Sequence, residues 1–147
     1  MTSSPTSDRV TVKVSRTYGH PPEKVFDAWL TPAQAGTFLF ATPQGQMVRA
    51  EIDARVGGGF VFTDRRDGQD VEHVGEYLEI DRPRRLVFTF AVPAFSAEKT
   101  TVTIEIAPAP GGGCELTLIH EGVLPDYAER TQGGWGMILD GLAKTLD

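Results

Sequence analysis

The hydrophobic pattern changes period early in the chain. Valine alternates with polar residues from position 10 to position 14, which is typical of a strand with one buried face. Between positions 22 and 30 the apolar residues instead recur at helical spacing after a proline pair, so we expect a short helix there. Pro32 follows directly and predicts a second short helix that runs to about Phe38.

A long section with strand character comes next. Its apolar segments are separated by glycine runs, prolines and the Asp67-Gly68 dipeptide, all of which are turn signals. Connections this short favour antiparallel neighbours in a meander. The expected strands cover residues 46–53, 59–63, 71–80, 86–92, 100–107 and 114–121.

Helical spacing returns at the C-terminal end, from about Asp126. An apolar stripe from Trp135 to Leu146 lies on one face of this helix, and Met137 falls on the polar side. Four glycines between 133 and 141 should each cost about 1 kcal/mol relative to alanine, so packing on the sheet must stabilise the helix. The order of elements predicts an α+β fold. A curved antiparallel sheet of about seven strands wraps around a long C-terminal helix, with two short helices after the first strand.

Composition and charge narrow the function classes. The 147 residues fit one domain, which we place at 9–147 after a flexible tail at 1–8. No secretory signal or membrane-length apolar run is visible, and the single cysteine, Cys114, does not require an oxidising environment. We therefore expect a cytoplasmic protein without membrane insertion. A net charge of −6 argues against nucleic acid as a partner.

Motifs of enzymatic or metal chemistry are sparse. The glycine run at 57–59 precedes a strand and predicts a turn rather than a phosphate cradle. His20, His73 and His120 lie in different expected elements without ligand spacing, so we expect neither a metal nor a cofactor. The arginines within 65–66 and 82–85 flank opposite ends of one strand, and we interpret them as solvated turn charges.

Several segments together resemble one known family. They include Gly57–Gly59 before Phe60, Gly75–Ile80, Arg85–Thr89 after Pro83, Leu116–Gly122 and the Gly134-Trp135 helix. In this combination the chain resembles the activator of heat-shock protein 90 ATPase homologue-like family, part of the START-like (SRPBCC) superfamily with the helix-grip fold. The resemblance implies a deep, largely apolar cavity under the long helix.

The strand faces that would line this cavity carry the candidate site. Residues at alternate positions share a face, and we take the aromatic parity of each strand as the inner one. For strand 71–80 the resemblance favours Tyr77 inward, and a bulge near Glu79 would let Ile80 point inward as well. The candidate ligand-binding residues are Phe60, Phe62, His73, Tyr77, Phe88, Phe90, Leu118, His120 and Trp135.

Three functions remain open at this point. The leading hypothesis is a non-enzymatic protein that binds a small hydrophobic or amphipathic molecule between the sheet and the helix, with no catalytic residue assigned. The alternatives are a co-chaperone-like interaction protein acting on the heat-shock protein 90 ATPase and a polyketide cyclase/dehydratase-like enzyme using the same cavity. Converging polar atoms of His73, Tyr77 and His120 would favour catalysis, whereas atoms tied to backbone groups would favour binding or packing. A homodimer is compatible with each hypothesis.

Overall fold

The computed structural model describes residues 9–39, 45–93 and 99–146, so the tail predicted for residues 1–8 lies outside the described residues. Two 3-10 turns, Pro110–Gly112 and Pro125–Tyr127, connect the later elements. The elements are β1 (Val10–Tyr18), α1 (Pro22–Leu30), α2 (Pro32–Phe38), β2 (Gln46–Ile52), β3 (Gly59–Arg66), β4 (Gln69–Asp81), β5 (Arg85–Phe90), β6 (Thr100–Pro108), β7 (Cys114–Val123) and α3 (Ala128–Leu146).

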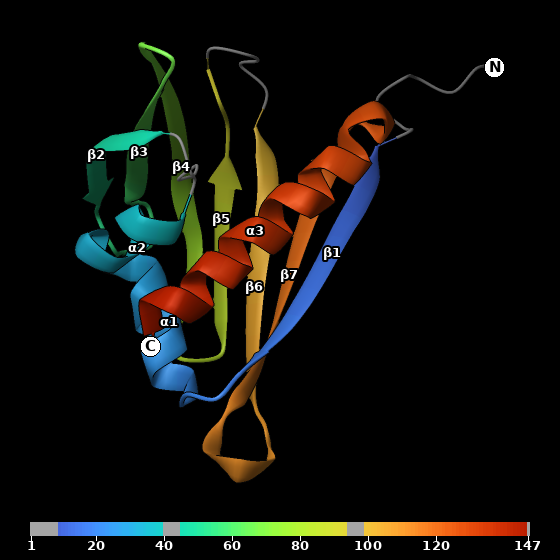
Figure 1. Cartoon of the computed structure of the whole chain (residues 1–147). Helices are drawn as coiled ribbons and strands as arrows, with labels where there is room; N and C mark the ends of the chain where they lie inside the picture. The colour runs from blue at the N-terminus through green and yellow to red at the C-terminus, as the bar shows by residue number, and fades with distance from the viewer. Residues whose placement is uncertain (1–8, 40–44, 94–98, 147) are drawn as a thin grey trace, which may run out of the picture.

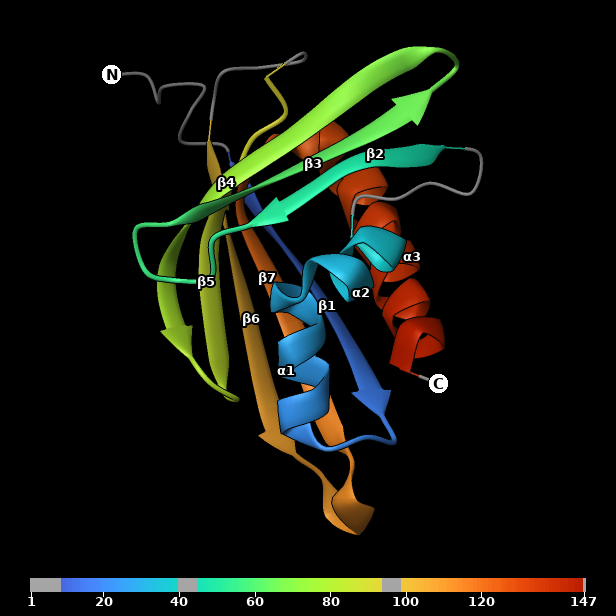
Figure 2. The same cartoon turned by 90° about the vertical axis from the view of Figure 1, so that its left-hand side faces the viewer.

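The seven strands form one antiparallel sheet in the order β1-β7-β6-β5-β4-β3-β2. Helix α3 crosses one face of this sheet diagonally, and we call that face the inner face (Figure 1). Helices α1 and α2 lie on the same side, where α1 contacts β6 and α2 contacts both β2 and α3 (Figure 2). The predicted α+β helix-grip fold is confirmed. No described helix is long and apolar enough to span a membrane.

The register of β4 against β5 contains the predicted irregularity. Tyr77 pairs with Phe88, but Glu79 pairs with Val87, so the register shifts between these two pairs. The extra residue, Leu78, is displaced outward and is 45% exposed. The bulge keeps both Tyr77 and Ile80 on the inner face, as expected.

Helix α3 is held to the sheet by its apolar stripe. Trp135, Leu139, Leu142 and Leu146 are buried, and Met137 is exposed as predicted. The helix begins at Ala128, slightly later than the expected Asp126, because residues 125–127 form a 3-10 turn.

Two glycines of α3 allow close approach to neighbouring elements. A Cβ on Gly136 would lie 3.1 Å from the guanidinium of Arg16 on β1, and a Cβ on Gly141 would lie 3.3 Å from Cβ of Phe38 on α2. Their cost in helix propensity is therefore offset by packing.

Candidate functional site

Four aromatic rings cluster on the inner face of β3, β4 and β5. The ring centroid of Phe60 lies 5.6 Å from Phe62, 5.8 Å from Tyr77 and 5.3 Å from Phe88. All four side chains are buried. Gly75 stands opposite Phe60 in the register, and a Cβ there would overlap the Phe60 ring and the backbone oxygen of Thr89. The glycine on β4 therefore makes room for the central ring of the cluster.

A second group of rings joins the sheet to α3 through Phe90. The Phe90 ring stacks on His73 with an interplanar angle of 5° and a centroid distance of 6.1 Å. Phe90 also meets His120 at 5.8 Å and Trp135 at 6.2 Å, both edge-on. Phe90 itself is only half-buried, whereas its three partners are buried. The ring surface thus continues from β4 across β5 and β7 to α3.

A directed chain of hydrogen bonds runs through His120. The indole Nε1–H of Trp135 donates to His120 Nδ1 over 3.0 Å. His120 Nε2 lies 2.6 Å from Thr100 Oγ1, and the Thr100 hydroxyl donates to the carbonyl oxygen of Phe90 over 3.2 Å. Because indole can only donate, Nδ1 must be the acceptor, and the ring proton therefore sits on Nε2 and points to Thr100. The arrangement fixes one neutral tautomer of His120.

Burial keeps both inner histidines neutral. It lowers the pKa of His73 and of His120 from 6.5 to about 4. His73 Nδ1 donates to the carbonyl oxygen of Phe62, its cross-strand partner, over 3.2 Å. Burial also raises the pKa of the Tyr77 phenol, so that group stays protonated at neutral pH. These titratable side chains are therefore uncharged at pH 7.

A partly buried ion pair lies at the end of the same strand face, and the sequence interpretation missed it. Arg66 Nε donates to Asp64 Oδ2 over 2.8 Å, with the Asp64 side chain 1% exposed and that of Arg66 33% exposed. Interpreting Arg66 as a solvated turn charge was wrong, whereas Arg65 does pair with Asp70 in solvent. The signal was present in the sequence, because Asp64 continues the alternate-position parity of the inner residue Phe62.

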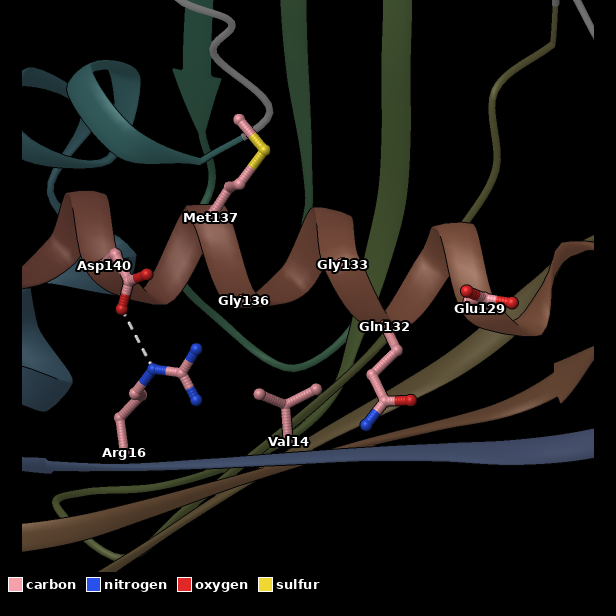
Figure 3. Close-up of a pocket in the computed structure, with 8 residues that line it drawn as sticks. All are labelled: Val14, Arg16, Glu129, Gln132, Gly133, Gly136, Met137 and Asp140. Atoms are coloured by element: carbon pink, nitrogen blue, oxygen red, sulfur yellow. Dashed lines mark hydrogen bonds and ion pairs between the residues drawn. The ribbon is translucent and has the colours of Figure 1, made fainter.

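The described residues also form a groove of about 420 Å³ on the β1 side of α3 (Figure 3). It does not contain the predicted candidate residues. The ion pair between Arg16 and Asp140 crosses it, with Nε and Oδ1 2.9 Å apart. Its lining is Val14, Arg16, Glu129, Gln132, Gly133, Gly136, Met137 and Asp140. This mixed, open surface differs in chemistry from the aromatic inner face.

The arrangement offers little for acid/base or metal chemistry. Both ring nitrogens of His120 are engaged, and His73 Nδ1 is held by a backbone carbonyl. Burial raises the pKa of the Cys114 thiol, which keeps it out of the nucleophilic thiolate form. Within residues 9–39, 45–93 and 99–146, no three His, Cys, Asp or Glu side chains gather as a metal ion would require. The geometry therefore favours binding or packing over catalysis.

Comparisons with known proteins agree with the fold. A protein from Chromobacterium violaceum has a TM-score of 0.83 at 28% identity, over 92% of this chain and 96% of its own. The AHSA1-like protein from Aeromonas hydrophila gives 0.80 at 19% identity, over 93% and 92% of the two chains. A Staphylococcus aureus protein of unknown function gives 0.83 at 16% identity, over 94% and 93%. The search of curated proteins gives no match.

The family model described as Activator of Hsp90 ATPase homolog 1-like protein matches residues 19–147, which include α1, α2, α3 and six of the seven strands. The chain therefore belongs to the Activator of Hsp90 ATPase homolog 1-like family, within the START-like (SRPBCC) superfamily.

Proposed function

We propose that this protein binds a small hydrophobic or amphipathic molecule on the inner face of the sheet beneath α3, in the cytoplasm. The observation that carries the proposal is the pair of ring groups on the inner face, one around Phe60 and Phe88 and the other around Phe90 and Trp135. Phe88 and Phe90 lie two positions apart on β5, so the two groups share one face of that strand. The wall of the proposed site consists of Phe60, Phe62, His73, Tyr77, Phe88, Phe90, Leu118, His120 and Trp135.

The chemistry of this surface favours an uncharged ligand body. Aromatic rings bury large apolar area, and pockets for small molecules usually combine such rings with few polar groups. His73 and His120 are neutral at pH 7 because their pKa values lie at about 4. The Asp64–Arg66 pair at the end of β3 provides a polar rim for the head of an amphipathic molecule. Binding there is burial of the ligand, with no covalent step.

A thermal-shift and native mass spectrometry screen tests the proposal. The panel contains medium-chain alcohols, ketones and methyl esters of graded length. A ligand at 100 times its Kd stabilises the folded state by about 2.7 kcal/mol, which raises Tm by roughly 5–10 °C in a domain of this size. Native mass spectra should show a one-to-one complex. A panel without any Tm shift or complex peak would contradict the proposal.

Two substitutions locate the binding surface within the molecule. Phe90→Leu replaces the half-buried ring that lies between His73 and Trp135, so the Kd of a hit should rise severalfold. Met137→Ala changes an exposed side chain in the groove on the other side of α3, so the Kd should stay unchanged. A raised Kd for Met137→Ala together with an unchanged Kd for Phe90→Leu would indicate that the ligand binds in the groove and not on the ring surface.

The family description favours a second candidate, stimulation of the Hsp90 ATPase. Its test is the ATP hydrolysis rate of purified Hsp90 with increasing amounts of this protein. A saturable rise in that rate supports the candidate, and a flat rate argues against it.

A further inference from the structure

Trp29 carries a buried hydrogen-bond donor that no described residue satisfies. Its side chain lies in α1 and is 1% exposed, edge-on against Phe38 with ring centroids 5.3 Å apart. The indole Nε1 has no acceptor among the described residues. Two other buried aromatic donors are paired, because Trp135 donates to His120 and the Tyr18 hydroxyl donates to the carbonyl oxygen of Leu139 over 2.8 Å.

A buried donor without an acceptor among residues 9–39, 45–93 and 99–146 is a candidate contact for a ligand. Leaving such a group unpaired typically costs about 1–3 kcal/mol, and buried polar groups in folded proteins nearly always have a partner. The position of Trp29 suits a ligand, since α1 lies over the inner face of the sheet (Figure 2). Trp29 also belongs to the same hydrophobic core as Phe60, Phe88 and Trp135.

We propose that Trp29 is the orienting polar contact of the ligand site, and that its Nε1–H donates to an uncharged oxygen acceptor of the ligand. This inference rests on the proposed function and narrows it to ketones, aldehydes, esters or ethers with an apolar body. The apolar setting of Trp29 against Phe38 selects among oxygen groups. A carboxylate would lose its hydration there, and a hydroxyl would bring a second proton that needs its own acceptor.

A matched pair of probes distinguishes the contribution of the ligand oxygen from that of the apolar body. 2-Undecanone carries the acceptor, and 2-methyl-1-undecene replaces the C=O group by an isosteric C=CH2 group. The protein is labelled with ¹⁵N and the two tryptophan indole resonances are assigned with Trp29→Phe or Trp135→Phe, whichever variant folds. The ketone should move the Trp29 indole proton downfield, and the alkene should not.

Affinity gives an independent readout. Trp29→Phe keeps an aromatic ring but removes the donor, so it should weaken ketone binding by about fivefold to tenfold while leaving alkene affinity unchanged. Phe38→Leu is the control, because it alters the packing against Trp29 and keeps the N–H group. The ketone should therefore still move the Trp29 proton in that variant.

Two outcomes overturn the inference, and they are distinct from failure of the proposed function. Ketone binding without movement of the Trp29 proton would leave the hydrophobic site standing and remove Trp29 as its polar contact. A water cross-peak on that proton in the ketone complex would assign the acceptor to a structural water. Absence of binding by both probes and by the whole thermal-shift panel would reject the ligand site itself.

Discussion

The hydrogen bond from Trp135 Nε1 to His120 Nδ1, 3.0 Å long, ties helix α3 directly to strand β7. This bond lies beside Phe90, whose ring is half-buried, and all three residues belong to the predicted candidate set. Because the Nε2–H of the same imidazole donates to the Thr100 hydroxyl, the helix, β7 and β6 share one polar connection through an apolar region. Such a connection is stabilising only while each member is satisfied.

Thr100→Val tests this connection. Valine keeps the shape of threonine but removes the acceptor of the His120 Nε2 proton, so the free energy of unfolding should fall by about 1–3 kcal/mol. Thr101→Val is the matched control on the same strand, because its side chain has the opposite parity and faces away from His120. We expect the control to change stability by no more than about 0.5 kcal/mol in urea unfolding. Equal effects of the two substitutions would contradict the hydrogen-bond chain.

Stability should depend on pH between 6.5 and 4 because of the two inner histidines. In the folded state the pKa of His73 and His120 is lowered to about 4, so the unfolded chain binds more protons below pH 6.5. The folded state therefore keeps its full stability above pH 6.5 and loses about 2 kcal/mol per histidine by pH 5. Below pH 4 these two groups cause no further loss.

Urea unfolding at pH 7.5, 6, 5 and 4.5 measures this dependence, and imidazole NMR signals show the protonation state directly. The charges of Arg66 and Asp64 act on His73 in opposite directions, with that of Arg66 the larger. Arg66→Gln should therefore raise the pKa of His73 and leave that of His120 unchanged. Unfolding free energies that stay constant from pH 7.5 to 5 would contradict the buried, neutral state of both histidines.

The fold was predictable because its signals are local and repeated. Alternation of apolar residues located the strands, and the parity of Phe60 and Phe62 set the inner face. On β4 the pattern left both parities open, and it was the family resemblance that placed Tyr77 inside; the bulge near Glu79 followed from placing Ile80 inside as well. The polar contacts were harder to predict from the sequence, because they depend on distances between elements.

Sequence periodicity alone could not place the Trp135 indole within reach of His120, which lies on another element. It could not show that the Trp29 N–H on α1 finds no acceptor in the part of the chain that the structure describes. The Asp64–Arg66 pair was missed for a different reason, since a charged pair after a strand is usually a solvated turn.

Glycine substitutions should separate required from dispensable glycines. A Cβ on Gly75 would overlap the Phe60 ring and the Thr89 backbone oxygen, so Gly75→Ala should destabilise the fold by roughly 2–4 kcal/mol or prevent folding. A Cβ on Gly134 would meet no atom within 4 Å, so Gly134→Ala should stabilise α3 by up to about 1 kcal/mol. Thermal unfolding of both variants measures the difference. Stabilisation by Gly75→Ala would refute the close approach of Phe60 to β4.

The coupling between Asp64 and Arg66 should exceed that of an exposed pair with the same spacing. Residues two positions apart on a strand point to the same face, as Asp64 and Arg66 do on β3. The chain offers a control pair with the same spacing, Arg49 and Glu51 on β2, whose Nε and Oε2 atoms are 2.7 Å apart. In the control pair both side chains are about half exposed or more, at 49% and 61%, whereas Asp64 is 1% exposed. A double-mutant cycle with alanine at both positions should give about 1–3 kcal/mol for Asp64–Arg66.

The Arg49–Glu51 cycle should give a much smaller coupling, because solvent and salt screen an exposed pair. Raising the salt concentration to 1 M should reduce that small value further and leave most of the Asp64–Arg66 coupling in place. A double-mutant cycle cancels the interactions that Asp64 makes with residues other than Arg66. If the Asp64–Arg66 coupling were as small as the Arg49–Glu51 coupling, Arg66 would not be the residue that neutralises the buried Asp64 carboxylate. The polar rim proposed for the ligand site would then consist of Asp64 with some other partner, and an amphipathic ligand with a cationic head would be favoured over a neutral one.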